Sequence, residues 1–219
     1  MFVKPKLMTH TPSQHSTQLV EQDMRVWLER AVIGLNLCPF AKAVHVKGQI
    51  HYAVSGAQTP QELRQDLVVE LKELQAHDPS ARDTTLLIAP DCLGDFLDFN
   101  DFLAQADQAL LDLALEGVLQ IASFHPDFQF AGTSEDDITN FTNRAPYPTL
   151  HLLREDSIDR AVQAFPEAES IFEQNMQTLE RLGPAGWAAL GVGRSAGPAD
   201  DETLSTRSAA GPNDENQEK

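Results

Sequence analysis

Helix-like and strand-like patterns alternate along most of this chain, and this alternation constrains the fold more than any other feature. Apolar residues at three- and four-residue spacing predict helices, whereas period-two alternation or a short continuous apolar run predicts strands. The element order is α-β-α-β-α-β-loop-β-α-α. The predicted helices cover about residues 16–36, 59–77, 96–115, 156–164 and 167–182, and the predicted strands cover residues 44–54, 84–89, 118–124 and 149–153.

This order predicts an α/β protein of the α+β type with one mixed four-stranded sheet. Two successive crossovers through helices imply parallel pairing of the first three strands, with right-handed connections. The long loop returns the chain, so we expect the fourth strand to run antiparallel to the third, with the helices mainly on one face or unequally on two. In residues 44–54, Gly48 predicts a bulge or, together with Lys47, a hairpin turn.

The 219 residues suffice for one domain with a full core, or at most for two small ones. We expect a single globular domain at residues 16–183, a flexible arm at residues 1–15 and a disordered acidic tail at residues 184–219. The tail contains the run ALGVGRSAG, which no predicted helix follows, so we interpret it as a linker. No glycine-rich phosphate loop is present, and the sequence assigns no cofactor.

Acidic residues outnumber basic ones by 33 to 16, and the net charge is -17. Nucleic acid and anionic membranes are therefore poor partners, because no Lys/Arg run offsets this charge. No apolar run approaches the roughly 20 residues that span a bilayer, and the N-terminus lacks the apolar core of a secretory signal. Two cysteines are too few for a disulfide scaffold. The sequence predicts a cytoplasmic protein and leaves its oligomeric state open.

A 24-residue stretch at residues 125–148 joins two predicted strands and is too long for a plain turn. Connections longer than roughly 12–15 residues are usually functional or disordered. This stretch and the residue before it carry aromatic anchors that disordered segments lack, so we predict that it forms the folded wall of a site. The anchors are Phe124, Phe128, Phe130, Phe141 and Tyr147.

Parallel strands would place several polar residues at one edge of the sheet, where ligands bind in open sheets. Asp91 follows the second strand and His125 follows the third. The returning loop would bring Asn143, Arg144 and Tyr147 within reach of that edge.

Arg144 follows a short helix that a capping-box-like sequence at Ser134 predicts for residues 135–142. An arginine held on a rigid loop suits a carboxylate or phosphate ligand. The alternative is that it pairs with Asp136 or Asp137 and only holds the loop.

Cys38 is the candidate nucleophile. Pro39 suits the first position of a helix, so Cys38 would occupy the N-cap, where amide donors and the helix dipole favour a thiolate. The run CPFA superficially resembles the site of glutaredoxins and some glutathione transferases, but here a helix precedes the cysteine and a strand soon follows it. A buried, unreactive cysteine is the alternative. A redox pair with Cys92 has no support from the spacing.

His125 and His151 are candidate acid-base groups or metal ligands. His151 would point to the face opposite its leucine neighbours, and several imidazoles would converge if that face also carried those of the first strand. No local spacing such as HExxH supports a zinc site, so we assign no metal. Loop-anchoring hydrogen bonds and a solvated strand face are the alternatives. The groups that would converge are His45, His51, His151, Asp91 and Asp127.

Three runs of sequence together resemble a family of bacterial proteins, domain of unknown function 1415. They are WLERAVIGLNLCPFA, ASFHPDFQFAGT and NFTNRAPYPTLHLLRE, and the resemblance covers about residues 17–182. It implies a soluble single-domain protein and brings no activity, substrate or cofactor. It draws attention to the segments that hold Cys38, His125, Asn143, Arg144, His151 and Arg154.

The leading hypothesis is a cytoplasmic enzyme that acts on a small anionic or acyl-type substrate by thiol-dependent hydrolysis, transfer or redox chemistry. Cys38 would be the nucleophile, His125 its base and Asn143 an orienting or oxyanion-stabilising group. Only a hairpin or a reversed first strand would bring Cys38 to the edge that holds His125. The substrate would be bound by Arg144, Tyr147, His151 and Arg154.

Two alternatives stay open. One is a metal- or anion-dependent hydrolase that uses His125, Asp127 and His151 without Cys38. The other is a non-catalytic module that binds a ligand or a protein through the long loop.

Overall fold

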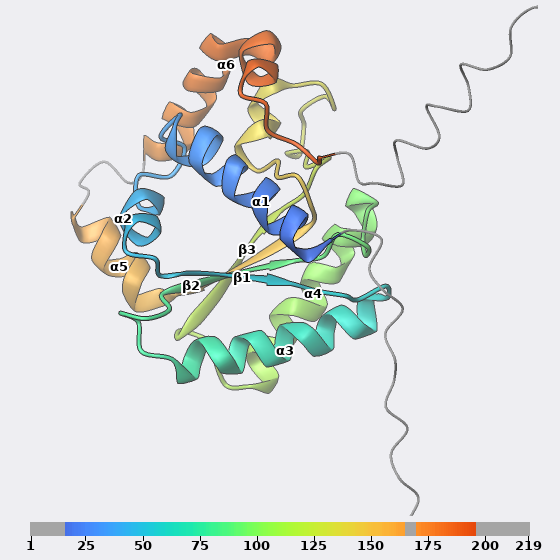
Figure 1. The fold of residues 1–219 in the computed structure, drawn as a ribbon, viewed down its shortest axis with the longest axis vertical. Coiled ribbons are helices and arrows are strands. Elements are labelled where there is room, and N and C mark those ends of the chain that lie inside the picture. Colours follow the sequence, from blue (N-terminus) through green and yellow to red (C-terminus); the bar gives the residue numbers. More distant parts are fainter. Residues whose placement is uncertain (1–15, 165–169, 196–219) are drawn as a thin grey trace, which may run out of the picture.

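The computed structural model describes residues 16–164 and 170–195, so the predicted arm at 1–15 and the predicted tail beyond residue 195 lie outside the described residues. The elements follow the predicted order, with one short helix added before the first strand (Figure 1). The helices are α1 (Thr17–Trp27), η1 (Leu28–Ile33), α2 (Ala41–Val46), α3 (Pro60–Ala76), α4 (Phe96–Asp112), η2 (Ile138–Thr142), α5 (Glu155–Ala164) and α6 (Ile171–Ala189), and the strands are β1 (Ile50–Val54), β2 (Thr84–Ile88), β3 (Leu119–Phe124) and β4 (Thr149–Arg154).

The four strands form one mixed sheet in the order β1-β2-β4-β3. β1 and β2 pair in parallel, and β4 pairs antiparallel with both β2 and β3, which confirms the predicted direction of the fourth strand. The first three strands run in the same direction, as predicted. However, β4 lies between β2 and β3, so the predicted pairing of the second and third strands is wrong. The carboxyl ends of β1, β2 and β3 therefore share one edge of the sheet with the start of β4.

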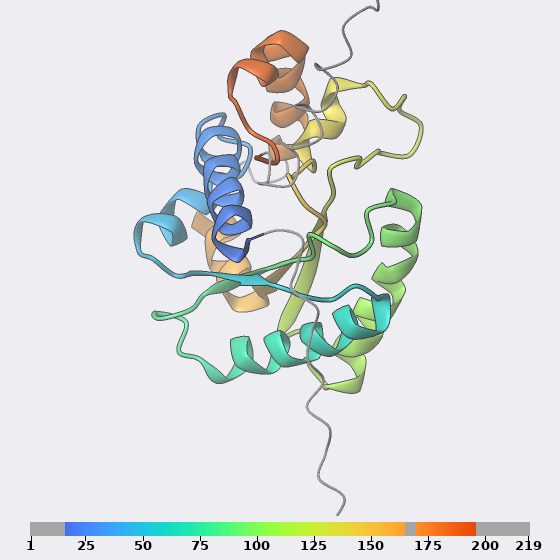
Figure 2. The same ribbon diagram turned by 45° about the vertical axis from the view of Figure 1, so that its right-hand side comes forward.

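Helices cover both faces of the sheet, which fits the second of the two predicted arrangements, in which they lie unequally on two faces (Figure 2). α3 and α4 lie on one side and α1 on the other. Alternate residues of β2 belong to two separate cores, because Leu87 packs in the cluster under α3 and α4 whereas Leu86 and Ile88 pack in the cluster under α1. All of β2 is buried, as its continuous apolar run predicted.

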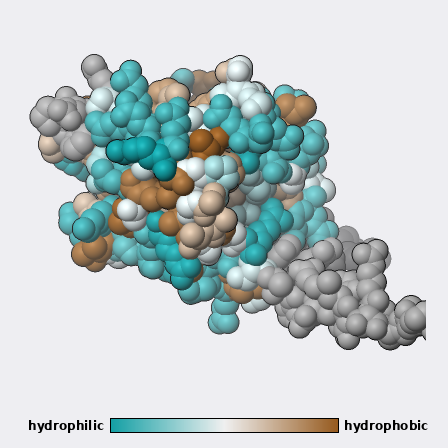
Figure 3. Space-filling view, turned by 90° about the horizontal axis from the view of Figure 1, so that it is seen from above, coloured by the Kyte–Doolittle hydropathy of each residue, from teal (hydrophilic) through white to brown (hydrophobic). Residues whose placement is uncertain are grey.

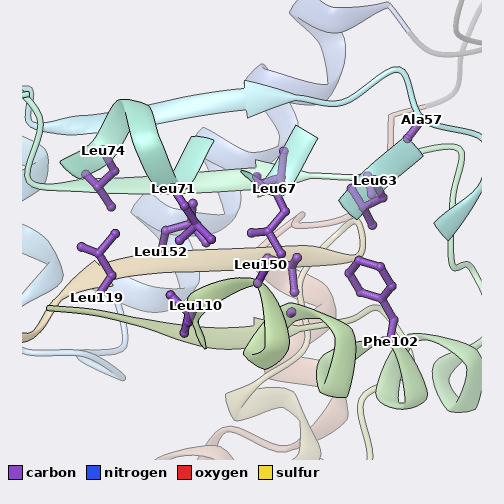
Figure 4. Close-up of a cluster of buried hydrophobic side chains, with 14 of the residues drawn as sticks. Ala57, Leu63, Leu67, Leu71, Leu74, Phe102, Leu110, Leu119, Leu150 and Leu152 are labelled. Carbon is purple, nitrogen blue, oxygen red and sulfur yellow. The ribbon is translucent and has the colours of Figure 1, made fainter. Parts of the chain in front are cut away.

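Figure 4 shows how the first of these clusters is built. Leucines that recur at three- and four-residue spacing on α3 face side chains from β4 and α4. The cluster includes Leu63, Leu67, Leu71 and Leu74 of α3, Leu150 and Leu152 of β4, and Phe102 and Leu110 of α4.

The predicted strand at residues 44–54 is wrong before residue 50, because residues 44–46 end α2 and β1 begins only at Ile50. Val44 and Val46 alternate with polar residues over too few positions for the pattern to distinguish a strand from a short helix. Gly48 (φ 68°) ends the helix in a left-handed conformation, and the Gln49 N–H donates to the Val44 carbonyl at 3.0 Å. This is a Schellman-type helix end rather than the predicted bulge or hairpin.

The first helix reaches the predicted end but changes form along its length. After α1, residues Leu28–Ile33 form the π-helix η1, which includes Arg30. Asn36 (φ 56°) provides the left-handed stop that the sequence predicted. A π-helical turn is rare and is often found at functional sites.

The sequence analysis placed the end of the domain at residue 183. The chain stays packed beyond this residue. Gly183 (φ 65°) interrupts α6, but the helix continues to Ala189. Trp187 then packs edge-on against Phe141, with ring centroids 4.9 Å apart. Residues 184–195 are therefore part of the domain.

Thr59 provides a test of the predicted start of α3. Its side chain accepts a hydrogen bond from the Glu62 N–H, and Glu62 in turn accepts from the Thr59 N–H. We predict that Thr59→Ala lowers the free energy of unfolding by about 1 kcal/mol. The variant removes the side-chain acceptor of the Glu62 N–H and so disrupts the reciprocal pair of hydrogen bonds at the start of the helix. Urea denaturation measures this, with the exposed Gln61→Ala as the control. Equal stability of the two variants would contradict the capping role.

Candidate functional site

The loop between β3 and β4 is folded, as its aromatic residues predicted, and Asn140 organises it. The Asn140 side chain is buried, and its Oδ1 accepts hydrogen bonds from the Phe130 N–H (3.0 Å) and the Thr133 hydroxyl (2.8 Å). Its Nδ2 donates to the Ser134 carbonyl (2.8 Å). A buried amide with three partners fixes the path of the backbone around it. The sequence analysis did not single out this residue.

The predicted helix at residues 135–142 is shorter than expected. It is the 3₁₀ helix η2, and Asp137 caps it by accepting a hydrogen bond from the Thr139 N–H at 2.9 Å. Ser134, the predicted cap, instead donates to the Asp136 carboxylate at 2.6 Å.

His125 is buried at the start of the loop, and both of its ring nitrogens have partners. Nδ1 accepts a hydrogen bond from the Asp127 N–H at 3.0 Å, so Nε2 carries the proton and donates to the Leu93 carbonyl at 3.1 Å. The rings of Phe96 and Phe99 pack against the imidazole. Burial lowers the pKa of His125, which favours the neutral form. These contacts favour the loop-anchoring alternative over a catalytic base.

Asn143 and Arg144 also bind backbone carbonyls of the loop and its flanking strand. Arg144 donates from Nε to the Phe128 carbonyl at 3.1 Å and from Nη2 to the Glu135 carbonyl at 2.6 Å. Asn143 donates from Nδ2 to the Ser123 carbonyl at 3.3 Å. Arg144 therefore holds the loop, but through backbone carbonyls rather than through the predicted pair with Asp136 or Asp137.

Arg154 lies at the opposite edge of the sheet, because it is the last residue of β4, whereas the long loop leads into the first. Its guanidinium donates to the carbonyls of Leu74, His77 (2.7 Å) and Arg82 (3.2 Å). Arg154 thus stabilises the C-terminal end of α3 and does not share an anion site with Arg144.

Cys38 and Cys92 pack in different cores, on opposite faces of the sheet, so they do not form a redox pair. The N-cap of α2 is Phe40, which corrects the predicted position of Cys38. Burial raises the pKa of the Cys38 thiol and outweighs the opposite effect of the nearby Phe40 and Ala41 N–H groups. His125 packs against α4 on the other side of the sheet, and the described residues show no contact between it and Cys38.

The imidazoles do not converge on one face. His45 lies in a helix, His51 and His151 lie on different strands, and each has its own partner. In the part of the chain that the structure describes, no group of three or more His, Cys, Asp or Glu side chains could hold a metal ion. The partners are Glu29 for His45 (3.5 Å), Glu70 for His51 (3.8 Å) and Thr84 for His151 (2.7 Å).

Tyr147 is the predicted site residue that reaches a junction between distant segments. Its hydroxyl donates to Asp23 Oδ2 of α1 at 2.8 Å. The Ser195 N–H donates to the same oxygen at 2.9 Å, and the Ser195 hydroxyl donates to Oδ1 at 2.6 Å. Arg194 lies over the Tyr147 ring at 4.8 Å and donates from Nε to the Pro146 carbonyl at 2.7 Å. These contacts connect α1, the end of the long loop and the chain after α6.

An open cavity of about 310 Å³ lies beside this junction. α1 and η1 supply one wall, and residues 191–195 supply the other. Burial and the Asp23 carboxylate raise the pKa of Tyr147, so its hydroxyl remains a hydrogen-bond donor at neutral pH. The polar side chains that line the cavity are Gln22, Asp23, Arg30, Arg194 and Ser195.

The sequence analysis missed this cavity, although two signals were present. Asp23 lies on the apolar stripe of the first helix, between Val20 and Trp27, where a charged side chain is buried. Buried carboxylates are rare and need partners. The run ALGVGRSAG combines glycines with Arg194, but we interpreted it as a linker.

The fold and the site define an α+β protein with a mixed open sheet and a polar cavity between its first helix and the chain that follows its last. The chain belongs to the family described as Protein of unknown function (DUF1415), whose model matches residues 19–189. The α1 wall of the cavity lies inside this match, and residues 191–195 lie just beyond it. No curated protein and no solved structure matches the chain. None of the helices that the structure describes is long and apolar enough to cross a membrane.

Cys38 is predicted to react slowly with iodoacetamide at pH 7, because its raised pKa leaves little thiolate. The measurement is mass spectrometry of the labelled protein over time, compared with the same protein in urea. We expect slow labelling of Cys38 in the folded protein and fast labelling after unfolding. Selective, rapid labelling of Cys38 without denaturant would contradict this and would support the thiol-dependent enzyme.

His151 is predicted to destabilise the protein in acid. Burial lowers its pKa to about 4, below the ordinary value of 6.5, so the unfolded state binds the proton first as the pH falls. The free energy of unfolding should decrease between about pH 6.5 and pH 4, by up to about 1.4 kcal/mol per pH unit. Urea denaturation at several pH values measures the slope, which should be shallower in His151→Gln. Equal slopes in the unmodified protein and in His151→Gln would show that His151 does not contribute to the loss of stability in acid.

Proposed function

We propose that this protein binds a small molecule that carries a carboxylate or phosphate group, in the cavity between α1 and residues 191–195. The observation that carries the proposal is that Arg30 and Arg194 line the same cavity. Arginine recognises carboxylates and phosphates through paired N–H donors. The proposal keeps the anionic ligand of the leading hypothesis and replaces Arg144 and Arg154 as the groups that bind it.

Both guanidinium groups are held in place by hydrogen bonds from only some of their N–H groups. Arg30 uses Nη1 for the carbonyls of Leu190 (2.9 Å) and Gly191 (3.4 Å). Arg194 uses Nε for the Pro146 carbonyl (2.7 Å). No acceptor among residues 16–164 and 170–195 takes the other N–H groups of either guanidinium. Donors that are already positioned lose little entropy when a ligand binds.

The glycine-rich wall adds backbone donors. Gly191 (φ 59°) and Gly193 (φ 157°) adopt conformations that side chains disfavour. The N–H groups of Val192, Gly193 and Arg194 have no hydrogen-bond acceptor among the residues that the structure describes. Neighbouring backbone N–H groups are common components of anion sites. An anion in this cavity would therefore find backbone as well as side-chain donors.

The overall charge of -17 repels anions at long range but does not decide binding at this cavity. The Debye length is about 8 Å at physiological ionic strength, so distant carboxylates are screened. The one carboxylate that lines the cavity, Asp23, already accepts three hydrogen bonds from Tyr147 and Ser195. The two arginines are the charged groups there with spare capacity for a ligand.

Binding, rather than catalysis, is the function that the cavity supports. No cysteine or histidine is among the described residues that line it. The Ser195 hydroxyl donates to Asp23, and no histidine among residues 16–164 and 170–195 forms a hydrogen bond with it that would make it a base for this hydroxyl. Thiol chemistry at Cys38 stays a prediction from the sequence, away from this cavity.

Isothermal titration calorimetry with succinate, inorganic phosphate and the neutral succinamide tests the proposal. We expect binding of at least one of the two anions and none of succinamide. Arg194→Met should weaken that binding about tenfold or more, which is the usual effect of losing a charge-assisted hydrogen bond.

Arg64→Met is the matched control, because Arg64 pairs with Asp112 between α3 and α4, on the other side of the sheet. Thermal melting of each variant checks that it is folded. An equal loss in both variants would show non-specific attraction, and the absence of binding by either anion would overturn the proposal.

A further inference from the structure

The two walls of the cavity run in opposite directions. On the helical wall, Asp23 of α1 and Arg30 of η1 are about 10 Å apart along the helix axis. Arg30 donates to the Gly191 carbonyl at 3.4 Å, and Asp23 accepts from the Ser195 hydroxyl at 2.6 Å. The chain after α6 therefore passes Arg30 first and Asp23 last, and it lies beside the first helix in both views of the fold (Figure 1, Figure 2).

Each wall contributes one valine between its two ends. Val26 lies between Asp23 and Arg30 in the first helix, and Val192 directly follows Gly191 in the facing chain. Both valines line the cavity, and both are only partly buried, so each still exposes apolar surface. We call Val26 and Val192 the valine pair.

Exposed apolar side chains elsewhere on this protein need no explanation when they occur singly. Val46 of α2 is 75% exposed, and on the face drawn in Figure 3 hydrophobic residues gather in a patch among hydrophilic ones. The valine pair differs because both members line a cavity that two arginines also line. A ligand that reaches these guanidinium groups is brought next to apolar surface on both walls.

The size and the lining of the cavity restrict the class of ligand further. Its volume of about 310 Å³ lies at the lower end of the range for ligand pockets, which is about 300–1,000 Å³. An inorganic phosphate ion would fill only part of it. No aromatic side chain is among the described residues that line it, so a nucleobase would find no ring on which to stack. These features favour a small aliphatic ligand over a nucleotide.

We propose that the ligand of this cavity is a carboxylic acid or a phosphate ester with a short aliphatic chain, and that Val26 and Val192 determine its specificity. This inference rests on the proposed anion site. The anionic group binds the arginines, and the aliphatic chain packs against the valine pair. Each methylene that the valines cover is removed from water, which strengthens binding.

Isothermal titration calorimetry of the full chain with two series of anions tests the proposal. The first series is acetate, butyrate and hexanoate, and the second is methyl phosphate and butyl phosphate, so the comparison also shows which anionic group the site prefers. We expect the affinity to rise with chain length in at least one series, by up to about fourfold for each methylene that becomes buried. Equal affinities within each series would overturn this inference and leave the proposed function in place. If none of these anions binds, and succinate and inorganic phosphate do not bind either, both are overturned.

Val26→Thr and Val192→Thr test the valine pair, because each replaces a methyl group by a hydroxyl that an aliphatic chain would desolvate. We expect each variant to lower the ratio of butyrate affinity to acetate affinity by about threefold or more. Val46→Thr is the matched control, since Val46 lies on α2 and does not line the cavity. General damage to the site would weaken both acids equally. A ratio that Val26→Thr and Val192→Thr both leave unchanged would overturn the inference.

Discussion

The buried carboxylate of Asp23 is the interaction on which the arrangement of the site depends. A carboxylate that is removed from water costs several kcal/mol unless hydrogen bonds replace its hydration. Asp23 receives three, from Tyr147 at the end of the long loop and from Ser195 beyond α6. It therefore joins the first helix to two segments that are 124 and 172 positions away in the sequence. Without it, the second wall of the cavity would lose the two hydrogen bonds that join Ser195 to α1.

The long loop has a different role from the one that its composition suggested. Its histidine, asparagine and arginine bind main-chain carbonyls and hold the loop itself. His125 also supports Leu93 (φ 56°), a bulky residue in a conformation that costs roughly 1 kcal/mol or more. The loop is thus a rigid support that carries Tyr147 to Asp23, and the residues with spare donors lie on the neighbouring segments.

Much of the fold could be predicted from the sequence because its signals are local. The capping box of Thr59, the left-handed stop at Asn36 and the continuous apolar run of β2 each depend on residues close together in the chain. The short helix α2 could not be predicted, because one turn of helix and a short alternating strand give the same pattern. The position of β4 between β2 and β3 depends on long-range pairing, which strand patterns do not specify.

The site was harder to predict than the fold, for a related reason. Tyr147 was correctly placed near the carboxyl edge, but its partner Asp23 belongs to a helix far away in the sequence. Arg144 and Arg154 were chosen for their charge. Their partners are backbone carbonyls. Every residue has one, so the sequence does not indicate which carbonyl an arginine binds. Arg30 and Arg194 become neighbours of one cavity only after α6 has packed and residues 191–195 have turned back towards α1.

Anomalous diffraction from crystals of the full chain soaked in selenate tests the central claim most directly. Selenate mimics the charge and the oxygen geometry of a phosphate, and selenium can be located without bias from the protein coordinates. The account predicts a selenium peak within hydrogen-bonding reach of Arg30 and Arg194, with Asp23 still bound to Ser195. An empty cavity, with selenium only at other surface arginines or lysines, would contradict it.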